Sequence, residues 1–238
     1  MNLNDNSTRM AKAMEIESTV MEGISNQVGR TILDVLHRRW SPRSFSSRQV
    51  EPEKLRVILE AARWAPSSHN EQPWSFVVAT KDSLEAYDRL LSCLNEKNRQ
   101  WAQYAPVLIL SVAKTYRGMD GKENRYAFHD VGLATANLIV QATALELYTH
   151  AMAGFSVQRA QEVLEIPEGY KPVAVIALGY LPESSGGDKL RTDGIAKIST
   201  RKPLDTFVFE GRWGNPAHIF DHCEDQGAED AREETFID

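Results

Sequence analysis

Apolar residues along the chain fall into short continuous runs and helical repeats. The continuous runs occupy residues 74–80 (WSFVVAT), 106–113 (PVLILSVA) and 173–181 (VAVIALGYL). Runs of this length indicate strands, and those with almost no polar position indicate strands covered on both faces. A shorter strand is predicted at 148–152, and a late extended segment at 206–209.

Helices are predicted between these strands from apolar spacing and proline positions. Pro52 suits the first turn of a helix, and Pro66 ends that helix. Between the two prolines, apolar residues recur at the i, i+3, i+4, i+7 positions of one helical face, namely Leu55, Ile58, Leu59 and Ala62. The other predicted helices run from 31 to 39, from a cap at Asp82 through 94, from 127 to 147 and from 157 to 164.

Length and pattern together set the fold class. The chain has 238 residues, of which 42% are hydrophobic, which is enough for one large domain or two small ones. Strands separated by helices and buried on both faces predict an α/β (α+β) fold. We expect a three-layer sandwich, with helices flanking a central sheet.

Negative charge is concentrated at the C-terminal end of the chain. The net charge is −6, but residues 221–238 contain eight acids and one Arg, so the rest of the chain is close to neutral. No basic stripe with interleaved aromatics is present, and nucleic acid is therefore not an expected partner. The longest uncharged stretch, 131–145, is too short to span a bilayer and is interpreted as a buried helix.

Cysteine use and several missing motifs narrow the chemistry further. Two cysteines and the absence of an N-terminal apolar run suit a cytoplasmic protein. The chain has no GxGxxG, GxxxxGK[ST] or GxSxG motif. His218, His222 and Cys223 have a spacing that could hold a metal, but their Gly/Pro-rich and acidic surroundings favour a solvated tail, so we expect no metal site.

A basic cluster follows the first predicted helix. Arg39, Ser41 and Arg43 alternate, so in an extended backbone their side chains would share one side. Two guanidinium groups and a hydroxyl can receive a phosphate and electron-rich carbonyls. The alternative is a solvated basic helix end, which the helix dipole also favours.

Five motifs, taken in order, resemble those of the nitroreductase family of FMN-dependent NAD(P)H oxidoreductases. They cover roughly residues 31–209. The motifs are Arg39-Trp-Ser-Pro-Arg-Ser-Phe45, Ala65-Pro-Ser-Ser-His-Asn-Glu-Gln-Pro-Trp74, His129-Asp-Val-Gly-Leu-Ala-Thr-Ala-Asn-Leu138, Ala151-Met-Ala-Gly-Phe155 and Ser199-Thr-Arg-Lys-Pro-Leu204.

The resemblance implies roles for individual residues. Arg39 and Arg201 would hold the FMN phosphate, Ser41 would contact the flavin or its ribityl chain, and Arg43 would lie near flavin N1 and O2. Gly154 would offer its backbone N–H to flavin N5. The implied cofactor-binding set also includes Trp40, Pro66 and Ala153. Ser67, Ser68 and Asn70 complete the set and would come from the partner subunit.

The same resemblance implies an architecture and an activity. It implies an intertwined homodimer around a mixed central sheet, with the FMN-binding domain at 31–210. Composition and charge assign the residues outside that domain to an N-terminal arm at 1–30 and a C-terminal extension with the acidic tail at 211–238. Electrons would pass from NADH or NADPH through the flavin to a nitroaromatic, quinone or similar small acceptor by a ping-pong mechanism, with no catalytic side chain. The alternatives are a specialised branch, such as flavin fragmentation, dehalogenation or small aldehyde or enone reduction, and a non-catalytic flavin-binding protein.

Two of these assignments have simpler alternatives in the residues themselves. Asn70 and Gln72 are also suited to a turn before a strand, and Gly154 to a loop position with positive φ.

Three other residues near these motifs are interpreted as structural rather than functional. Trp64 and Trp74 are interpreted as core residues rather than as residues that stack on a substrate, and His129 as a helix-start residue rather than an acid or base.

Overall fold

The computed structural model of the chain describes residues 32–118, 120–182 and 201–218. The chain divides into one unit of residues 35–199 and another formed by residues 1–34 and 200–238. The predicted N-terminal arm and the acidic tail from 221 onward lie outside the described residues. Within the described ranges, no helix is both long and apolar enough to cross a membrane.

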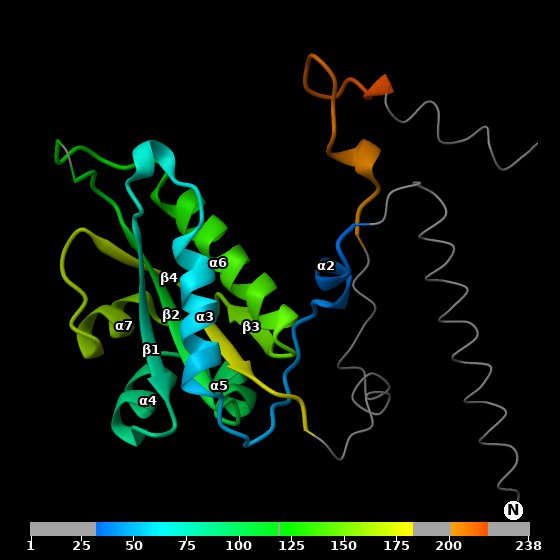
Figure 1. Cartoon of the computed structure of the whole chain (residues 1–238). Coiled ribbons are helices and arrows are strands. Elements are labelled where there is room, and N and C mark those ends of the chain that lie inside the picture. The colour runs from blue at the N-terminus through cyan, green and yellow to red at the C-terminus, as the bar shows by residue number, and fades with distance from the viewer. Residues whose placement is uncertain (1–31, 119, 183–200, 219–238) are drawn as a thin grey trace, which may run out of the picture. The chain divides into compact units, whose positions relative to one another are not determined.

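Four strands form the central sheet of the larger unit (Figure 1). Strands β1 (Trp74–Thr80), β2 (Val107–Lys114), β4 (Tyr170–Gly179) and β3 (Tyr148–Met152) lie side by side in that order. The strands predicted at 74–80 and 148–152 are confirmed at those residues, and the runs at 106–113 and 173–181 form β2 and β4.

All three strand pairings are antiparallel, so the mixed sheet implied by the resemblance is wrong for the strands that the structure describes. The register gives the reason. Thr80 pairs with Val107, so the segment between β1 and β2 leaves and re-enters the sheet at the same end. A connection of that kind reverses the chain, whereas a parallel pair needs a crossover to the opposite end.

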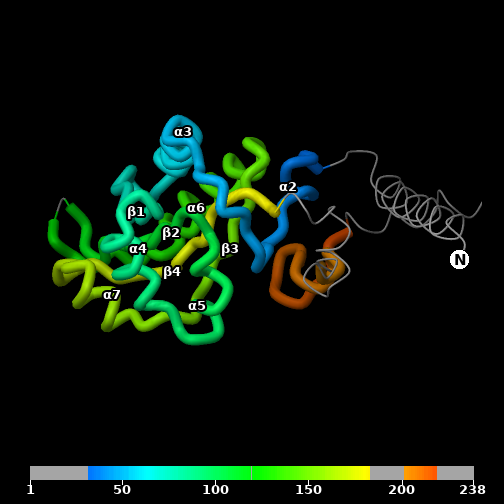
Figure 2. Tube along the Cα trace, turned by 90° about the horizontal axis from the view of Figure 1, so that it is seen from below, coloured from blue at the N-terminus to red at the C-terminus, as the bar shows by residue number. Residues whose placement is uncertain are grey.

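Helices cover both faces of the sheet, which confirms the three-layer arrangement (Figures 1 and 2). One face packs against α3 (Pro52–Arg63) and α6 (Ala127–Ala144), and the other against α4 (Leu84–Leu91), α5 (Glu96–Ala102) and α7 (Val157–Val163). Strand β2 serves both layers, because alternate side chains point to opposite faces. Leu108 and Leu110 join one core, and Val107 and Ile109 join the other.

Several helix predictions are corrected. The helix expected from Asp82 through 94 is instead two helices, α4 and α5, and Asn95 caps the second by accepting a hydrogen bond from the Asn98 N–H. The Asp82 carboxylate does not cap a helix. It accepts hydrogen bonds from the Gln49 side chain at 2.8 Å and the Thr80 hydroxyl at 3.1 Å.

The two ends of the described chain also differ from expectation. Of the described residues of the predicted helix 31–39, which are 32–39, only Asp34–Arg38 are helical, as α2. The segment expected to be extended at 206–209 begins inside a short 3₁₀ turn, η3 (Leu204–Thr206), and only Phe209 forms an isolated bridge, with Pro216.

A polar network joins the end of β4 to the start of α3. The Tyr180 hydroxyl donates to the Glu51 carboxylate at 2.5 Å and accepts from the Lys54 ammonium at 2.8 Å. The Arg48 guanidinium lies 4.0 Å from the centre of the Tyr180 ring and also bonds Glu51 at 2.6 Å. The bond from Tyr180, followed by a backbone hydrogen bond and that from Arg48, holds the pKa of Glu51 at about 2, below its ordinary 4.5.

We expect Tyr180→Phe to lower the free energy of unfolding at neutral pH by more than it does in acid. A carboxyl whose pKa is depressed in the folded state stabilises the protein above its unfolded value, near 4.5, and that contribution is lost as the pH falls toward 2. Urea unfolding at pH 7 and pH 3 measures the difference, with Tyr104→Phe on the exposed surface as a control. A Tyr180→Phe effect of equal size at both pH values would contradict this linkage.

Candidate functional site

The basic segment 39–43 follows the end of α2 and is neither helix nor strand. The Arg39 Nη1 donates to the Ser41 hydroxyl at 3.3 Å, so these two side chains meet as their alternation predicts. The Trp40 ring packs edge-on against Tyr148 of β3, with the ring centres 6.0 Å apart. Arg43 is exposed.

A histidine on a distant strand supports this segment. His150 of β3 has its Nδ1 2.9 Å from the carbonyl oxygen of Pro42. Its ring lies 4.6 Å from that of Trp101 in α5, and Trp101 in turn stacks on Phe45. Burial, as the largest influence, lowers the pKa of His150. Nothing in the local sequence marks this residue, because its partners come from distant segments.

The loop after β3 places Ala153 and Gly154 beside α5. The Gly154 carbonyl accepts hydrogen bonds from the Asn95 N–H and the Asn98 side-chain amide, both at 3.1 Å. A Cβ at Gly154 would lie 2.4 Å from the Asn95 Nδ2 and 2.6 Å from the Asn98 Nδ2. Gly154 does not have positive φ, so the alternative of a loop glycine with positive φ is wrong. Glycine fits here because two asparagine side chains pack against its backbone.

The second polar motif forms a turn between α3 and β1, built around η1 (Ser68–Asn70). The Ser68 N–H donates to the Asp130 carboxylate at 2.9 Å, and the Gln72 N–H donates to the Ser67 hydroxyl at 3.0 Å. The Gln72 side chain also donates to the Asn70 carbonyl at 3.3 Å, so Gln72 does stabilise the turn. Pro66 is exposed at its start.

The aromatic residues near this turn behave differently from one another. Trp74 is half-buried and packs against the core, as expected. Trp64 is 74% exposed, so its assignment to the core is wrong. The face of α3 that contacts the sheet carries Ile58 and Ala62, and position 64 lies on a different side of the helix. His129 lies in the first turn of α6, as expected.

The two polar motifs lie at opposite ends of α6. Asp130, which holds the Ser68 turn, is in its first turn, whereas Trp40 and Arg38 lie with Thr143 and Glu146 around a cavity of about 180 Å³ at its last turn. The distance along the helix from residue 130 to residue 143 is about 20 Å at 1.5 Å per residue. Figure 1 shows η1 near one end of α6 and α2 near the other. A single chain therefore does not bring the two motifs together, and Arg201 belongs to the other unit.

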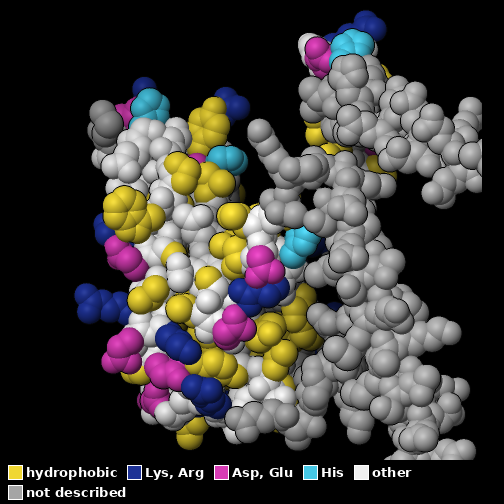
Figure 3. All heavy atoms as spheres, turned by 45° about the vertical axis from the view of Figure 1, so that its right-hand side comes forward, with side chains coloured by type: hydrophobic (Ala, Val, Ile, Leu, Met, Phe, Trp, Pro, Cys, Tyr) yellow, Lys and Arg dark blue, Asp and Glu magenta, His cyan; other side chains and the backbone are white. Residues whose placement is uncertain are grey.

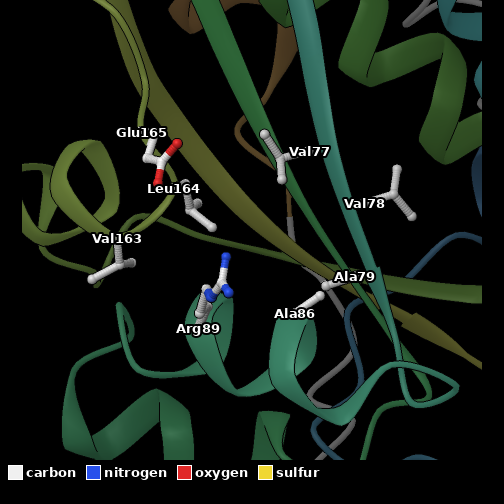
Figure 4. A pocket seen from close by; sticks show the side chains of 8 residues that line it. All are labelled: Val77, Val78, Ala79, Ala86, Arg89, Val163, Leu164 and Glu165. Carbon is white, nitrogen blue, oxygen red and sulfur yellow. The ribbon is translucent and has the colours of Figure 1, made fainter.

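A larger cavity, of about 220 Å³, lies elsewhere (Figure 4). It is formed by β1, α4 and the end of α7, and its charged lining residues are Arg89 and Glu165. No residue of the sequence-predicted site lines it, and its volume is below the range of about 300–1,000 Å³ that is usual for small-molecule pockets. We do not assign it to the site.

Comparison with known proteins gives consistent matches. Residues 36–180 match the family model described as "Nitroreductase family". A Mycolicibacterium smegmatis protein known only as an uncharacterised 15.4 kDa protein is 36% identical over 135 residues, which cover 57% of this chain and 90% of that protein. A putative NADH dehydrogenase/NAD(P)H nitroreductase of Archaeoglobus fulgidus is 29% identical over 156 residues, with 62% of this chain and 84% of that protein covered.

Two further matches extend the comparison. An iodotyrosine deiodinase of Haliscomenobacter hydrossis is 29% identical over 176 residues, covering 63% of this chain and 78% of that protein. A crystal structure described as an oxidoreductase containing FMN superposes with a TM-score of 0.70 at 35% identity, covering 79% of this chain and 96% of that one.

The buried histidine generates a pH-dependent prediction. Because burial lowers the folded-state pKa of His150, the unfolded chain takes up a proton more readily, and stability is lost as the pH falls below 6.5. We expect His150→Gln to lack this part of the acid destabilisation between pH 7 and pH 5. Chemical denaturation across that range measures it, with His37→Gln on the exposed face of α2 as the control. Parallel pH curves for the wild type and His150→Gln would contradict the expectation.

The packing around Gly154 generates a steric prediction. Gly154→Ala should lower the free energy of unfolding by about 1–3 kcal/mol, because Asn95 and Asn98 must move and weaken their bonds to the loop. Asn95→Ser keeps a helix-capping side chain but removes the nearer clash, so the double variant should recover part of this loss. Thermal unfolding of the two single variants and the double variant tests it, and strictly additive effects would argue against the clash.

Proposed function

The chain belongs to the nitroreductase family, and we propose that it is an FMN-dependent oxidoreductase that passes electrons from NADH or NADPH to a small acceptor in two half-reactions. Nitroaromatics and quinones are the acceptor classes we favour. The observation that carries the proposal is the likeness, over 79% of the chain and at 35% identity, to an oxidoreductase containing FMN.

The residues of this chain fit an FMN molecule. A phosphate carries negative charge and several acceptor oxygens, and the adjoining Arg39 guanidinium and Ser41 hydroxyl supply matching donors. We assign Arg39 and Arg201 to the phosphate, and Ser41 and Trp40 to the region next to it. When bound, FMN would supply the two-electron redox chemistry, and the protein would bind and orient it.

Arg43 of the basic segment and the Ala153–Gly154 loop would contact the flavin ring. Arg43 would stabilise negative charge near N1 and O2, since a cation favours the reduced form of the ring over the oxidised form. Ala153 and Gly154 would form the wall beside N5, and the peptide of Gly154 is held in orientation by the hydrogen bonds from Asn95 and Asn98. No side chain needs to act as a nucleophile, and we assign no catalytic acid or base.

A complete site requires a second copy of the chain. We propose a homodimer in which Pro66, Ser67, Ser68 and Asn70 of one subunit meet the Arg39–Arg43 segment of the other. The separation of the two motifs along α6 supports this, because one subunit cannot bring both to one ligand.

The surface of α6 supports the same assembly. The stretch 131–145 is uncharged, yet Gly132, Ala136 and Ala144 are exposed in the single chain, and Phe128 and Trp64 are exposed nearby. A Cβ at Gly132 would meet nothing within 4 Å, so packing within the described residues does not account for the glycine. Figure 3 shows hydrophobic side chains interspersed with charged ones on the side turned toward the viewer. Obligate interfaces bury on the order of 2,000 Å² or more.

A specialised branch of the family is the second candidate. The likeness to an iodotyrosine deiodinase favours reductive dehalogenation over the other specialised reactions. A non-catalytic flavin carrier is distinguished from both enzymes by its failure to be reduced by nicotinamide. We also propose a cytoplasmic location, since Cys93 is a free, buried thiol in a domain that uses no disulfide among its described residues.

The purified protein provides the test. We expect a flavin absorbance spectrum that bleaches anaerobically on addition of NADH or NADPH and recovers when a quinone, a nitroaromatic or a halotyrosine is added. Arg39→Ala should weaken FMN binding roughly ten- to a hundred-fold, since a charge-assisted contact contributes about 1.5–3 kcal/mol. Arg89→Ala, on α4, is the matched control. Unchanged FMN affinity in Arg39→Ala would contradict the assignment of the phosphate site.

A further inference from the structure

A buried carboxylate lies at the start of α6. Asp130 is 2% exposed, and its two oxygens have different partners. Its Oδ2 accepts the Ser68 N–H at 2.9 Å, and its Oδ1 lies 2.9 Å from the Nδ1 of His129. A buried carboxylate is destabilising unless its oxygens are paired, and the first turn of a helix favours negative charge. Asp130 lies in the first turn of α6, and both of its oxygens are paired, one of them with the backbone of another segment.

The segment that Asp130 holds is conformationally strained. His69, Asn70 and Gln72 all have positive φ, at 54°, 55° and 47°. Asparagine tolerates this region, whereas histidine and glutamine adopt it less readily. Such a backbone persists only where its surroundings hold it in place, and strain of this kind is concentrated at functional sites.

Three side-chain oxygens accept hydrogen bonds from backbone N–H groups in or beside the strained turn, and the three bonds are not equivalent. The Ser67 hydroxyl accepts from the Gln72 N–H at 3.0 Å, within the turn. The Glu71 carboxylate accepts from the Gly118 N–H at 2.9 Å on the exposed surface. Of these three, only the bond accepted by Asp130 involves a buried carboxylate, and Asp130 belongs to the long helix α6. This bond fixes Ser68, the first residue of η1, relative to the layer that packs on the sheet.

We propose that Asp130 is the positioning residue for the Ser67–Asn70 turn, and through that turn for the half of the flavin site that one subunit contributes to its partner. The inference rests on the proposed FMN function and on the proposed dimer. Asp130 acts through the Ser68 backbone and does not touch the cofactor itself. Its loss should therefore weaken FMN binding at the partner's Arg39 segment and leave the segment of its own subunit intact.

A mixed dimer tests this assignment directly. One subunit carries Arg39→Ala, the other carries Asp130→Ala, and different affinity tags allow the mixed species to be isolated. If Asp130 acts across the interface, one site of the mixed dimer carries both changes and the other carries neither. We expect each homodimeric variant to bind FMN at least ten-fold more weakly, and the mixed dimer to regain wild-type affinity at half the sites.

The readout is FMN stoichiometry and affinity from flavin fluorescence, which does not depend on turnover. A general loss of stability would not be complemented in this way. A mixed dimer with no high-affinity site would overturn the proposal, because Asp130 would then act on its own subunit or on folding alone. Should Asp130→Ala fail to fold, Asp130→Glu enters the mixed dimer in its place with the same two outcomes. The Asp130→Glu substitution keeps the negative charge but moves the carboxylate by one methylene group.

A conservative variant separates geometry from charge. Asp130→Asn still presents an oxygen to the Ser68 N–H, and its homodimer should bind FMN within a few-fold of the wild type. An Asp130→Asn variant as weak as Asp130→Ala would overturn the positioning role. The failure of this inference is distinguishable from that of the proposed function. Wild-type protein that binds no FMN refutes the function, whereas FMN binding that depends on Arg39 but not on Asp130 refutes the inference alone.

Discussion

The burial of β2 on both faces is the constraint on which the rest of the structure depends. Seven of its eight residues are buried, and alternate side chains enter two separate cores. A strand of this kind is stable only if one helical layer covers each face, and each covering helix must then be apolar on the side toward the sheet. The basic segment, the Gly154 loop and the strained turn accordingly lie outside the strands and the covering helices.

The sequence predicts the elements whose signals are local. Pro52 begins a helix, and the apolar runs at 74–80 and 148–152 form strands, because periodicity and proline geometry need no information from distant residues. The break at Asn95 was missed, because the helix cap there also depends on contacts with the Gly154 loop. The antiparallel order was missed for a similar reason, since strand direction is set by pairing between distant segments.

The candidate site shows the same division between local and distant information. The motifs around Arg39, Ser68 and Gly154 are visible in the sequence as dense polar or glycine-containing segments. His150 lies in none of these motifs, and Asp130 lies in the 129–138 motif without a role that the sequence reveals, because each acts on a backbone group more than sixty positions away. The reason for glycine at position 154 was also hidden, since it lies in two asparagine side chains of another helix. Sequence patterns thus predict the groups that could contact a ligand better than the groups that hold them in place.

The position of the two motifs at the ends of α6 has a consequence for how such a chain can change over time. One added residue rotates everything beyond it by about 100° and advances it by about 1.5 Å along the axis. An insertion or deletion within α6 would therefore turn Asp130 and its strained loop away from the register set by Thr143 and Glu146. Loops of the molecule can lengthen without this effect, and many helix residues can be exchanged for others of similar size. Sequence changes in α6 must therefore keep its number of residues, even where they replace individual residues.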